Sequence, residues 1–349
     1  EATAKPASLS AKSSSRLAPN RQAAGVEIRG LRRLAVGMGF AVETAQPKRA
    51  MAIDHQSMYL SRDDAEPDGF VRRLVRELGV HDWLVLVFLV ILTVIALRCE
   101  PSHDQRVSAI RMGSLLAFQV ATLILVRGRI LKHGFWAPLM YRFAIYGTVQ
   151  LSYFFLARLL PLVNPSTVDL ELYQLDLRLF GFEPAIAMDA IVTPVTTEWF
   201  AFFYFGYFFL LAIHVIPVLL FSRSTRLLSE FALGMLTVFC VGHLVYMLVP
   251  GYGPYRALAS EFHNTLPHGM WRDMVMATVA SGGSQMDIFP SLHTAAPTFI
   301  ALFSFRHRDK LPFKASWPVT AFCAVNIVGA TMFLRWHWFV DVVAGVMLA

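Results

Sequence analysis

Charged residues are scarce in this sequence. Only 16% of its 349 residues are Asp, Glu, Lys or Arg, whereas about a quarter is usual for soluble domains. Hydrophobic residues make up 56%. This composition excludes an ordinary soluble enzyme, and it excludes disorder over most of the chain.

Cysteine is also rare, and no region shows the polar–apolar alternation of a strand. Cys99, Cys240 and Cys323 lie in or at the end of apolar runs, which excludes a disulfide framework and a cysteine-rich zinc site. Basic residues exceed acidic ones by 31 − 24 = 7. This excess flanks the apolar runs instead of forming a basic stripe, so we expect no nucleic-acid partner.

Residues 1–70 differ from the rest of the chain. In residues 1–50, nine lysines and arginines accompany three glutamates, with many Ala and Ser and no long apolar run. The missing apolar run argues against a secretory signal peptide. A transit peptide would fit this composition, as would a translation start at Met51. We favour a disordered, basic cytoplasmic tail.

Long apolar runs dominate the remainder. A helix that crosses the hydrocarbon core needs about 20 mostly apolar residues. The later runs approach this length, the first three reach it with flanking residues, and the last is cut short, so we expect the sequence to stop inside a helix. We predict an all-α, polytopic membrane bundle of about eight transmembrane helices, at residues 83–97, 112–126, 143–163, 199–222, 231–255, 288–305, 315–334 and 338–349.

Basic residues also predict the orientation of the bundle. They concentrate in the loops 127–133, 222–226 and 306–314. With eight spans these loops and the tail share one side, which the positive-inside rule makes cytoplasmic. The connection at 161–197 is rich in acids and lies on the other side, whereas the loop 98–111 fits the rule least well.

Three segments on the expected outer side carry chemically active residues. The last of them contains His337 and Asp341, which would share a face if the final helix begins near Trp336. A carboxylate beside an imidazole fixes its tautomer and prepares the other ring nitrogen for attack. A His–Asp pair that caps a helix is the structural alternative.

The segment around Ser291 has the features of a helix start. Pro290 suits the first turn of a helix, and Ser291 with the amides after it would form an anion-binding helix N-terminus. His293 adds a proton donor at the same place. An N-cap serine followed by an interfacial histidine would explain this segment without any chemistry.

Arg256 follows a glycine-rich turn at 250–255. Arginine clamps phosphate oxygens, and the glycines allow close approach of the backbone. Considered without the other segments, Arg256 is better interpreted as an interfacial arginine at a helix end. The specific signal is that Arg256, His293, His337 and Asp341 fall on three loops of one membrane face.

Together these segments resemble the type 2 phosphatidic acid phosphatase superfamily, which includes bacterial acid phosphatases and vanadium haloperoxidases. Pro290-Ser291-Leu292-His293 resembles its second motif, with Leu in place of Gly. His337 and Asp341 match the end of its third motif. The resemblance covers roughly residues 140–349.

Details of these motifs look most like the inositolphosphotransferase branch, which includes inositol phosphorylceramide synthase. The forms Phe-Pro-Ser-Leu-His and His-Trp-Phe-Val-Asp and the segment 175–184 carry this likeness. The first motif of the superfamily, Lys-x6-Arg-Pro, is absent, so Arg256 replaces it by position only. Thr331 stands where the third-motif arginine is expected, and Arg335 is its candidate substitute. The altered clamp favours a lipid phosphodiester or transferase substrate.

Composition and hydropathy predict a disordered basic tail at 1–70 and two N-terminal transmembrane helices at 71–135. The resemblance implies a catalytic membrane domain at 136–349 with a six-helix phosphatase core. It implies a metal-independent phosphatase or headgroup phosphotransferase of the cell membrane, without a cofactor, that acts on a lipid phosphate or phosphodiester at the extracytoplasmic surface of the bilayer. The implied roles are a phosphohistidine at His337, orientation by Asp341, acid–base catalysis by His293, and phosphate binding by Arg256, Ser291 and Arg335.

Two other interpretations stay open. A metal-dependent membrane hydrolase could use His293, His337 and Asp341 as two histidine ligands and a carboxylate. A lipid transporter or lipid-binding protein would need no catalysis, but it predicts polar residues distributed through the spans, and few occur.

Overall fold

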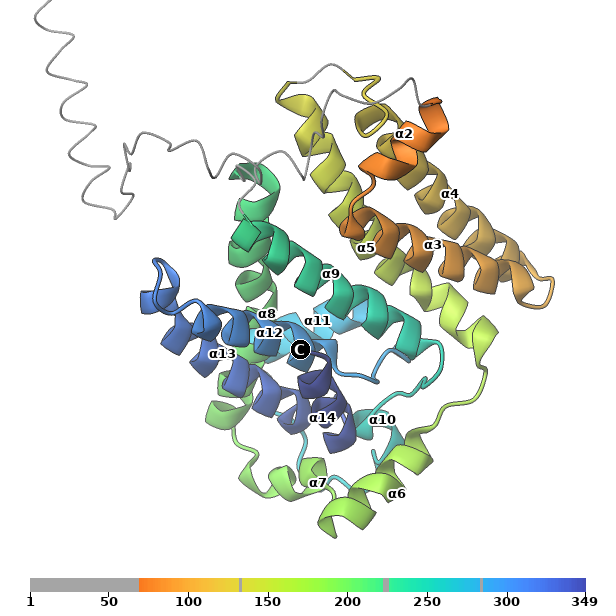
Figure 1. The fold of residues 1–349 in the computed structure, drawn as a ribbon. Helices are drawn as coiled ribbons and strands as arrows, with labels where there is room; N and C mark the ends of the chain where they lie inside the picture. Colours follow the sequence, from red (N-terminus) through yellow and green to blue (C-terminus); the bar gives the residue numbers. More distant parts are fainter. Residues whose placement is uncertain (1–68, 132–133, 222–225, 283–284) are drawn as a thin grey trace, which may run out of the picture. The chain divides into compact units, whose positions relative to one another are not determined.

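The computed structural model describes residues 69–131, 134–221, 226–282 and 285–349 (Figure 1). Within these ranges it contains thirteen α-helices, one short 3-10 helix and no strand, which confirms the all-α prediction. The N-terminal tail, the transit peptide and the start at Met51 were predicted for residues outside the described ranges. The three cysteines are all free.

Six helices are long and apolar enough to cross a membrane, and they indicate an integral membrane protein. They are α3 (Val80–Arg98), α4 (His103–Val126), α5 (Trp136–Val163), α8 (Pro194–Phe221), α9 (Arg226–Tyr246) and α13 (Phe313–Phe333). The two other predicted runs form α12 (Leu292–Arg306) and α14 (Phe339–Leu348). These have 15 and 10 residues, fewer than the roughly 20 that a span needs. The eight runs thus correspond to eight helices, of which six have the length of a span.

The other helices are short and lie before the first span or in the connections. They are α2 (Phe70–Glu77), α6 (Asp169–Phe180), α7 (Pro184–Met188), the 3-10 helix η1 (Asp189–Ile191), α10 (Pro254–Ala257) and α11 (Met270–Ser281). The acid-rich connection at 161–197 is therefore largely helical. Its helix α6 contacts both α10 and α14 (Figure 1).

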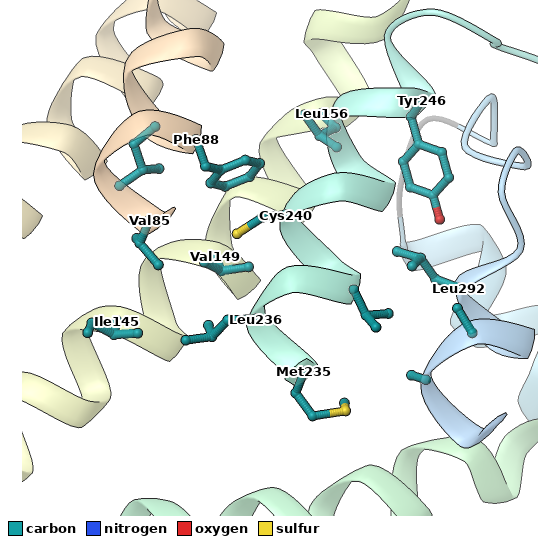
Figure 2. Close-up of a cluster of buried hydrophobic side chains, with 14 of the residues drawn as sticks. Val85, Phe88, Ile145, Val149, Leu156, Met235, Leu236, Cys240, Tyr246 and Leu292 are labelled. Atoms are coloured by element: carbon teal, nitrogen blue, oxygen red, sulfur yellow. The ribbon is translucent and has the colours of Figure 1, made fainter. Parts of the chain in front are cut away.

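Helix α9 joins the N-terminal helices to the later ones. It packs against α3 and α5 on one side and against α12 on the other. In Figure 2, Leu236 and Cys240 point toward α3 and α5, and Tyr246 points toward Leu292. Because lipid is as apolar as these side chains, close packing holds such helices together more than the hydrophobic effect does.

A small separate cluster of buried side chains lies where α6 meets the segments before α12 and α14. Leu172 of α6 packs with Ile288, Trp338 and Val340, and Trp338 is fully buried. This cluster brings α6 against the two segments that sequence analysis singled out around Ser291 and His337.

Helix α6 has an inverted polarity. Asp169, Leu172 and Asp176 form its buried face, whereas Leu170 and Leu179 are 62% and 59% exposed. A helix of a soluble protein places its leucines inside and its carboxylates outside. An outward apolar face suits a helix that lies at a membrane surface.

Candidate active site

His337 and Asp341 lie close together, but not on one helix face. Helix α14 begins at Phe339, within the predicted run 338–349 but after the start near Trp336 that a shared face requires, and Trp338 is its N-cap. Asp341 closes a capping box, in which Oδ2 accepts the N–H of Trp338 at 3.0 Å. The same oxygen lies 3.4 Å from Nδ1 of His337. The capping turn therefore brings the imidazole and the carboxylate together.

Both members of this pair are buried. His337 is 4% exposed and Asp341 is fully covered. Burial lowers the pKa of His337 to about 4, although the nearby charge of Asp287 and the backbone of Ile288 act in the opposite direction. The imidazole is therefore neutral near pH 7, and a neutral imidazole has the free lone pair that a nucleophile requires.

Thr331 orders the turn before His337. Its carbonyl oxygen accepts the N–H groups of Trp336 at 2.9 Å and His337 at 3.2 Å. Its hydroxyl donates to the carbonyl of Val328 at 2.7 Å within α13. Thr331 stands where the superfamily has its third-motif arginine, and its hydroxyl hydrogen-bonds within α13.

Ser291 is the N-cap of α12. Its Oγ accepts the N–H of Thr294 at 3.2 Å, and the helix begins at Leu292. Pro290 lies before the N-cap, which corrects its expected place in the first turn, because the serine side chain already closes that turn. Among the described residues, the N–H groups of Leu292 and His293 have no hydrogen-bond acceptor. Unpaired amides at a helix N-terminus form an anion-binding position.

The imidazole of His293 is held by two tyrosines of α8. It stacks on Tyr204 with ring centroids 4.4 Å apart and planes at 12°, and its centroid lies 4.2 Å from that of Tyr207. Its Nε2 is buried without a hydrogen-bond partner in the described part of the chain. This nitrogen is therefore available to a ligand.

The two histidines face each other across the starts of α12 and α14. Their ring centroids are 6.3 Å apart. The N–H of Ser291 donates to the carbonyl of Asp341 at 3.1 Å. A Cβ at Gly345 would lie 2.5 Å from the carbonyl oxygen of Ser291, so only glycine allows this approach. The structure thus joins the segment around Ser291 to the segment that contains His337 and Asp341.

The loop that carries Arg256 lies against the turn before His337. Gly253 has a φ of 85°, and a Cβ there would be 2.2 Å from the carbonyl oxygen of Trp336. The N–H of Tyr255 donates to the carbonyl of Arg335 at 2.8 Å. Close approach of two backbones at a positive φ explains the glycine at position 253.

Arg256 itself is exposed. Its guanidinium carbon lies 3.8 Å from the ring centroid of Tyr252. Among the described residues no carboxylate forms an ion pair with it. Stacking on an aromatic ring orients a guanidinium and leaves its N–H groups free for an anion.

Arg335 already has a carboxylate partner. Its Nη2 lies 2.7 Å from Oδ1 of Asp189, and its guanidinium lies over the ring of Phe262. Asp189 also accepts the N–H groups of His263 and Asn264. Arg335 has a φ of 67°, a conformation that costs about 1–3 kcal/mol in a non-glycine residue and persists where neighbours enforce it. The positive charge of Arg335 is therefore paired with Asp189, and this ion pair connects the turn before His337 to the segment of Asp189.

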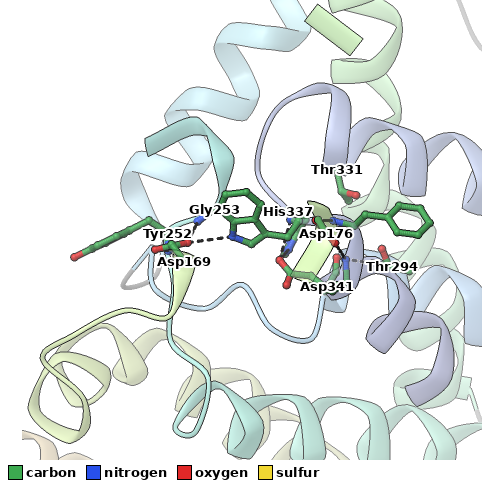
Figure 3. Close-up of polar contacts among 12 residues, drawn as sticks. Asp169, Asp176, Tyr252, Gly253, Thr294, Thr331, His337 and Asp341 are labelled. Atoms are coloured by element: carbon green, nitrogen blue, oxygen red, sulfur yellow. Dashed lines mark hydrogen bonds and ion pairs between the residues drawn. The ribbon is translucent and has the colours of Figure 1, made fainter. Parts of the chain in front are cut away.

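Sequence analysis missed the two carboxylates that connect these segments. Asp169 accepts the N–H groups of Tyr252 and Gly253, each at 2.9 Å, and the indole Nε1–H of Trp338 at 3.1 Å. Asp176 accepts the N–H groups of Phe339 at 2.8 Å and Val340 at 3.0 Å. In Figure 3, Asp169 lies beside the loop of Tyr252 and Gly253, and Asp176 lies beside Asp341 and His337.

The sequence held a signal for these residues. Asp169, Leu172 and Asp176 are spaced i, i+3 and i+7, which is one face of a helix. Our interpretation counted the acids of this connection only as charge on the outer side. Carboxylates that share a helix face with a leucine predict a buried polar face.

The arrangement of possible metal ligands bears on the metal-dependent alternative. In the described ranges no three His, Cys, Asp or Glu side chains are grouped so that they could hold a metal ion. His293 lies beside His337, and His337 lies beside Asp341, but in the described part of the chain no ion pair joins His293 to Asp341. A chelator test remains the direct measurement.

Comparison with known proteins places this site in a family. Neither a curated protein nor a solved structure matches the chain. The model of the PAP2 superfamily matches residues 170–349. This range includes the loop of Arg256, the start of α12 and the whole of α14, and it is just over half of the chain. The chain therefore belongs to the PAP2 superfamily.

Proposed function

We propose that this protein is a membrane enzyme that transfers or hydrolyses the phosphoryl group of a lipid phosphate or phosphodiester through a phosphohistidine. The observation that carries the proposal is the pair of facing histidines, with ring centroids 6.3 Å apart, one of which is backed by a buried carboxylate. A phosphorus atom between the two rings could contact both.

His337 is the nucleophile in this proposal. Its Nδ1 faces Asp341 at 3.4 Å, so Nε2 attacks phosphorus. The P–N bond forms as the bond from phosphorus to the leaving oxygen breaks. Asp341 stabilises the positive charge that develops on the imidazole, as a carboxylate behind a catalytic histidine does.

His293 exchanges the protons. Burial and the neighbouring His337 lower the pKa of His293 to about 3, so His293 takes up its proton together with the anionic substrate. As an imidazolium it then gives this proton to the leaving oxygen, and as a neutral imidazole it takes a proton from water or an alcohol. That oxygen attacks the phosphohistidine, the P–N bond breaks, and both histidines return to their starting states. Water gives a phosphatase, and an alcohol acceptor gives a transferase.

Donors around the site stabilise the phosphoryl oxygens. The candidates are the N–H groups of Leu292 and His293 at the start of α12 and the guanidinium of Arg256, none of which has a competing acceptor within the described ranges. Ser291 supports them by capping the helix. Arg335, which the sequence assigned to phosphate binding, acts here through its ion pair with Asp189.

The likeness to the inositolphosphotransferase branch favours a phospholipid headgroup donor. The positive-inside pattern supports an outer location of the site. Under this proposal the lipid chains lie among the helices and the headgroup reaches the site from the extracytoplasmic leaflet.

The deciding experiment incubates the purified protein with 32P-labelled phosphatidic acid and with headgroup-labelled phosphatidylinositol, each with and without ceramide, and then isolates acid-labile phosphoprotein. We expect turnover and an acid-labile, alkali-stable label in wild type. His337→Ala should lose both, and Asp341→Asn should keep residual activity. Vanadate should inhibit and EDTA should not. Full activity of His337→Ala would falsify the mechanism, and loss of activity with EDTA would favour the metal-dependent alternative.

A further inference from the structure

Glu183 is a buried carboxyl that the proposed reaction does not use. It follows α6, and its Oε1 accepts the N–H of Ala185 at 3.1 Å, which caps α7. The side chain is nearly inaccessible, and its Oε2 receives no hydrogen bond from the described residues. A buried carboxylate oxygen without a donor is costly. An oxygen in this position is better satisfied as an O–H that donates.

Asp176 is the neighbouring carboxyl group with which Glu183 interacts electrostatically, and it is therefore the acceptor that we assign to a Glu183 O–H. Asp176 is fully buried and accepts two N–H groups at the start of α14. Two buried carboxyl groups in contact do not both ionise. Because Asp176 has two backbone donors and Glu183 has one, the negative charge belongs on Asp176 and the proton on Glu183.

We propose that Glu183 is a positioning residue of the active site, which donates a hydrogen bond from its neutral carboxyl to Asp176 and so fixes the start of α14. That start contains Asp341, which faces His337, so the geometry of the nucleophile depends on the carboxyl pair. The inference rests on the proposed function, because it assigns Glu183 to the same reaction centre.

The electrostatic surroundings agree with a neutral Glu183. Burial raises the pKa of Glu183 to about 8, the N–H of Ala185 opposes this, and Asp176 and Asp341 raise it further. These two carboxyl groups, from α6 and α14, are the charged groups that face it. Asp189, which follows α7 in the chain, is engaged by Arg335. Above this pH a second negative charge would appear beside Asp176, and among the described residues no cation forms an ion pair with either carboxylate.

The sign of the effect on stability follows from the same values. The ordinary pKa of a glutamate is 4.5, and the folded protein raises it to about 8. Between these values the folded state holds a proton that the unfolded state has lost. The stabilising contribution of this proton is therefore complete below pH 4.5 and disappears as the pH rises through about 8.

The experiment compares Glu183→Gln and Glu183→Ala with matched changes at Glu171, an exposed glutamate of α6. Initial rates are measured with labelled phosphatidic acid in detergent micelles from pH 6 to 9. The glutamine amide can donate to Asp176 while its oxygen caps α7, so Glu183→Gln should keep kcat within about twofold at pH 7. Glu183→Ala should lose about 10- to 100-fold, because misplacement of catalytic groups by about 1 Å has this effect. The Glu171 variants should match wild type.

The pH profile separates positioning from a merely structural role. Wild-type activity, divided by that of Glu183→Gln, should fall as the pH rises through about 8. Parallel profiles of the two proteins would overturn the proposal, as would a Glu183→Gln variant as inactive as Glu183→Ala. Wild-type kcat in Glu183→Ala would overturn it too.

A second readout does not require activity. The unfolding midpoints of wild type and Glu183→Gln are measured in detergent from pH 5 to 9, and the wild-type midpoint should decrease relative to the variant as the pH rises. If the two midpoint curves stay parallel over this pH range, the proposal that Glu183 donates a hydrogen bond to Asp176 is wrong. Diverging curves in a protein with no activity on any lipid phosphate would support the pair while the proposed function fails.

Discussion

The indole nitrogen of Trp338 donates a 3.1 Å hydrogen bond to Oδ1 of Asp169. The same carboxylate accepts the N–H groups of Tyr252 and Gly253. One side chain of α6 therefore fixes both the residue that follows His337 and the loop that carries the expected phosphate-binding arginine.

We predict that Asp169→Ala impairs catalysis far more than Trp338→Phe. Trp338→Phe keeps a ring and removes one donor, so it should cost about 1 kcal/mol of stability. Asp169→Ala leaves three buried donors unpaired and should lower kcat about 100-fold through displacement of the loop. Rates and thermal midpoints in detergent check both. Wild-type rates in Asp169→Ala would contradict the role of this carboxylate.

Arg256 and Arg335 should differ in what their loss affects. Arg256 is exposed and has no carboxylate partner among the described residues, so Arg256→Ala should lower kcat/KM by about 100- to 1,000-fold, as the loss of a transition-state donor does. Its thermal midpoint should not change. A lowered thermal midpoint with normal kcat/KM would instead show that Arg256 contributes to stability and does not bind the phosphoryl group.

Arg335→Ala should instead act through stability. It leaves Asp189 buried without its cation, which costs about 3–5 kcal/mol for a buried pair. A double-mutant cycle with Asp189→Ala should show strong non-additivity of the unfolding free energies. Additive losses, together with a specific rise in KM for Arg335→Ala, would support direct phosphate binding by this residue.

Gly345 should not tolerate a side chain. A Cβ there would lie 2.5 Å from the carbonyl oxygen of Ser291, so Gly345→Ala must separate α12 from α14. We expect a loss of about 1–3 kcal/mol, as for other overpacked sites, and reduced activity. Gly147→Ala is the control: no atom lies within 4 Å of its added Cβ, and a helical Gly→Ala change is favourable by up to about 1 kcal/mol. Equal effects at the two positions would contradict the packing argument.

Sidedness can be measured with single cysteines. Ser260 lies in the connection between α9 and α12, which we expect on the outer side. Arg308 lies in a basic loop, and both residues are exposed. In a background without Cys99, Cys240 and Cys323, a membrane-impermeant thiol reagent on intact cells should label position 260 and spare position 308. The opposite labelling would reverse the proposed orientation.

The sequence predicted the helices better than their ends. Continuous apolar runs mark membrane helices because lipid imposes the same requirement along the whole span. Helix ends depend on local geometry: the apolar run 231–255 overlaps α9, which begins at Arg226 and ends at Tyr246, and the loop beyond it is shaped by Gly253. The start of α14 was misplaced for a similar reason, because Asp341 caps the helix from inside its first turn.

The site was predictable only in part. His293 and His337 could be found because their motifs are local. The spacing of Asp169 and Asp176 predicts a shared buried face but not their partners, since these are contributed by segments distant in sequence. Their burial also opposes the usual expectation for acids, and only the hydrogen bonds from distant backbone groups make it favourable.

The contacts between α6 and the last helix determine when the site can assemble. The bond from Phe339 to Asp176 spans 163 residues of chain. A ribosome adds about 5–20 residues per second, so synthesis separates these partners by roughly 10–30 seconds. During that interval Asp176 lacks both of the N–H donors that make its burial favourable, whereas Asp169 meets the N–H groups of Tyr252 and Gly253 earlier. The contact between α6 and α14 therefore forms only after α14 has been synthesised, and a chain truncated before position 339 would leave Asp176 without these two donors.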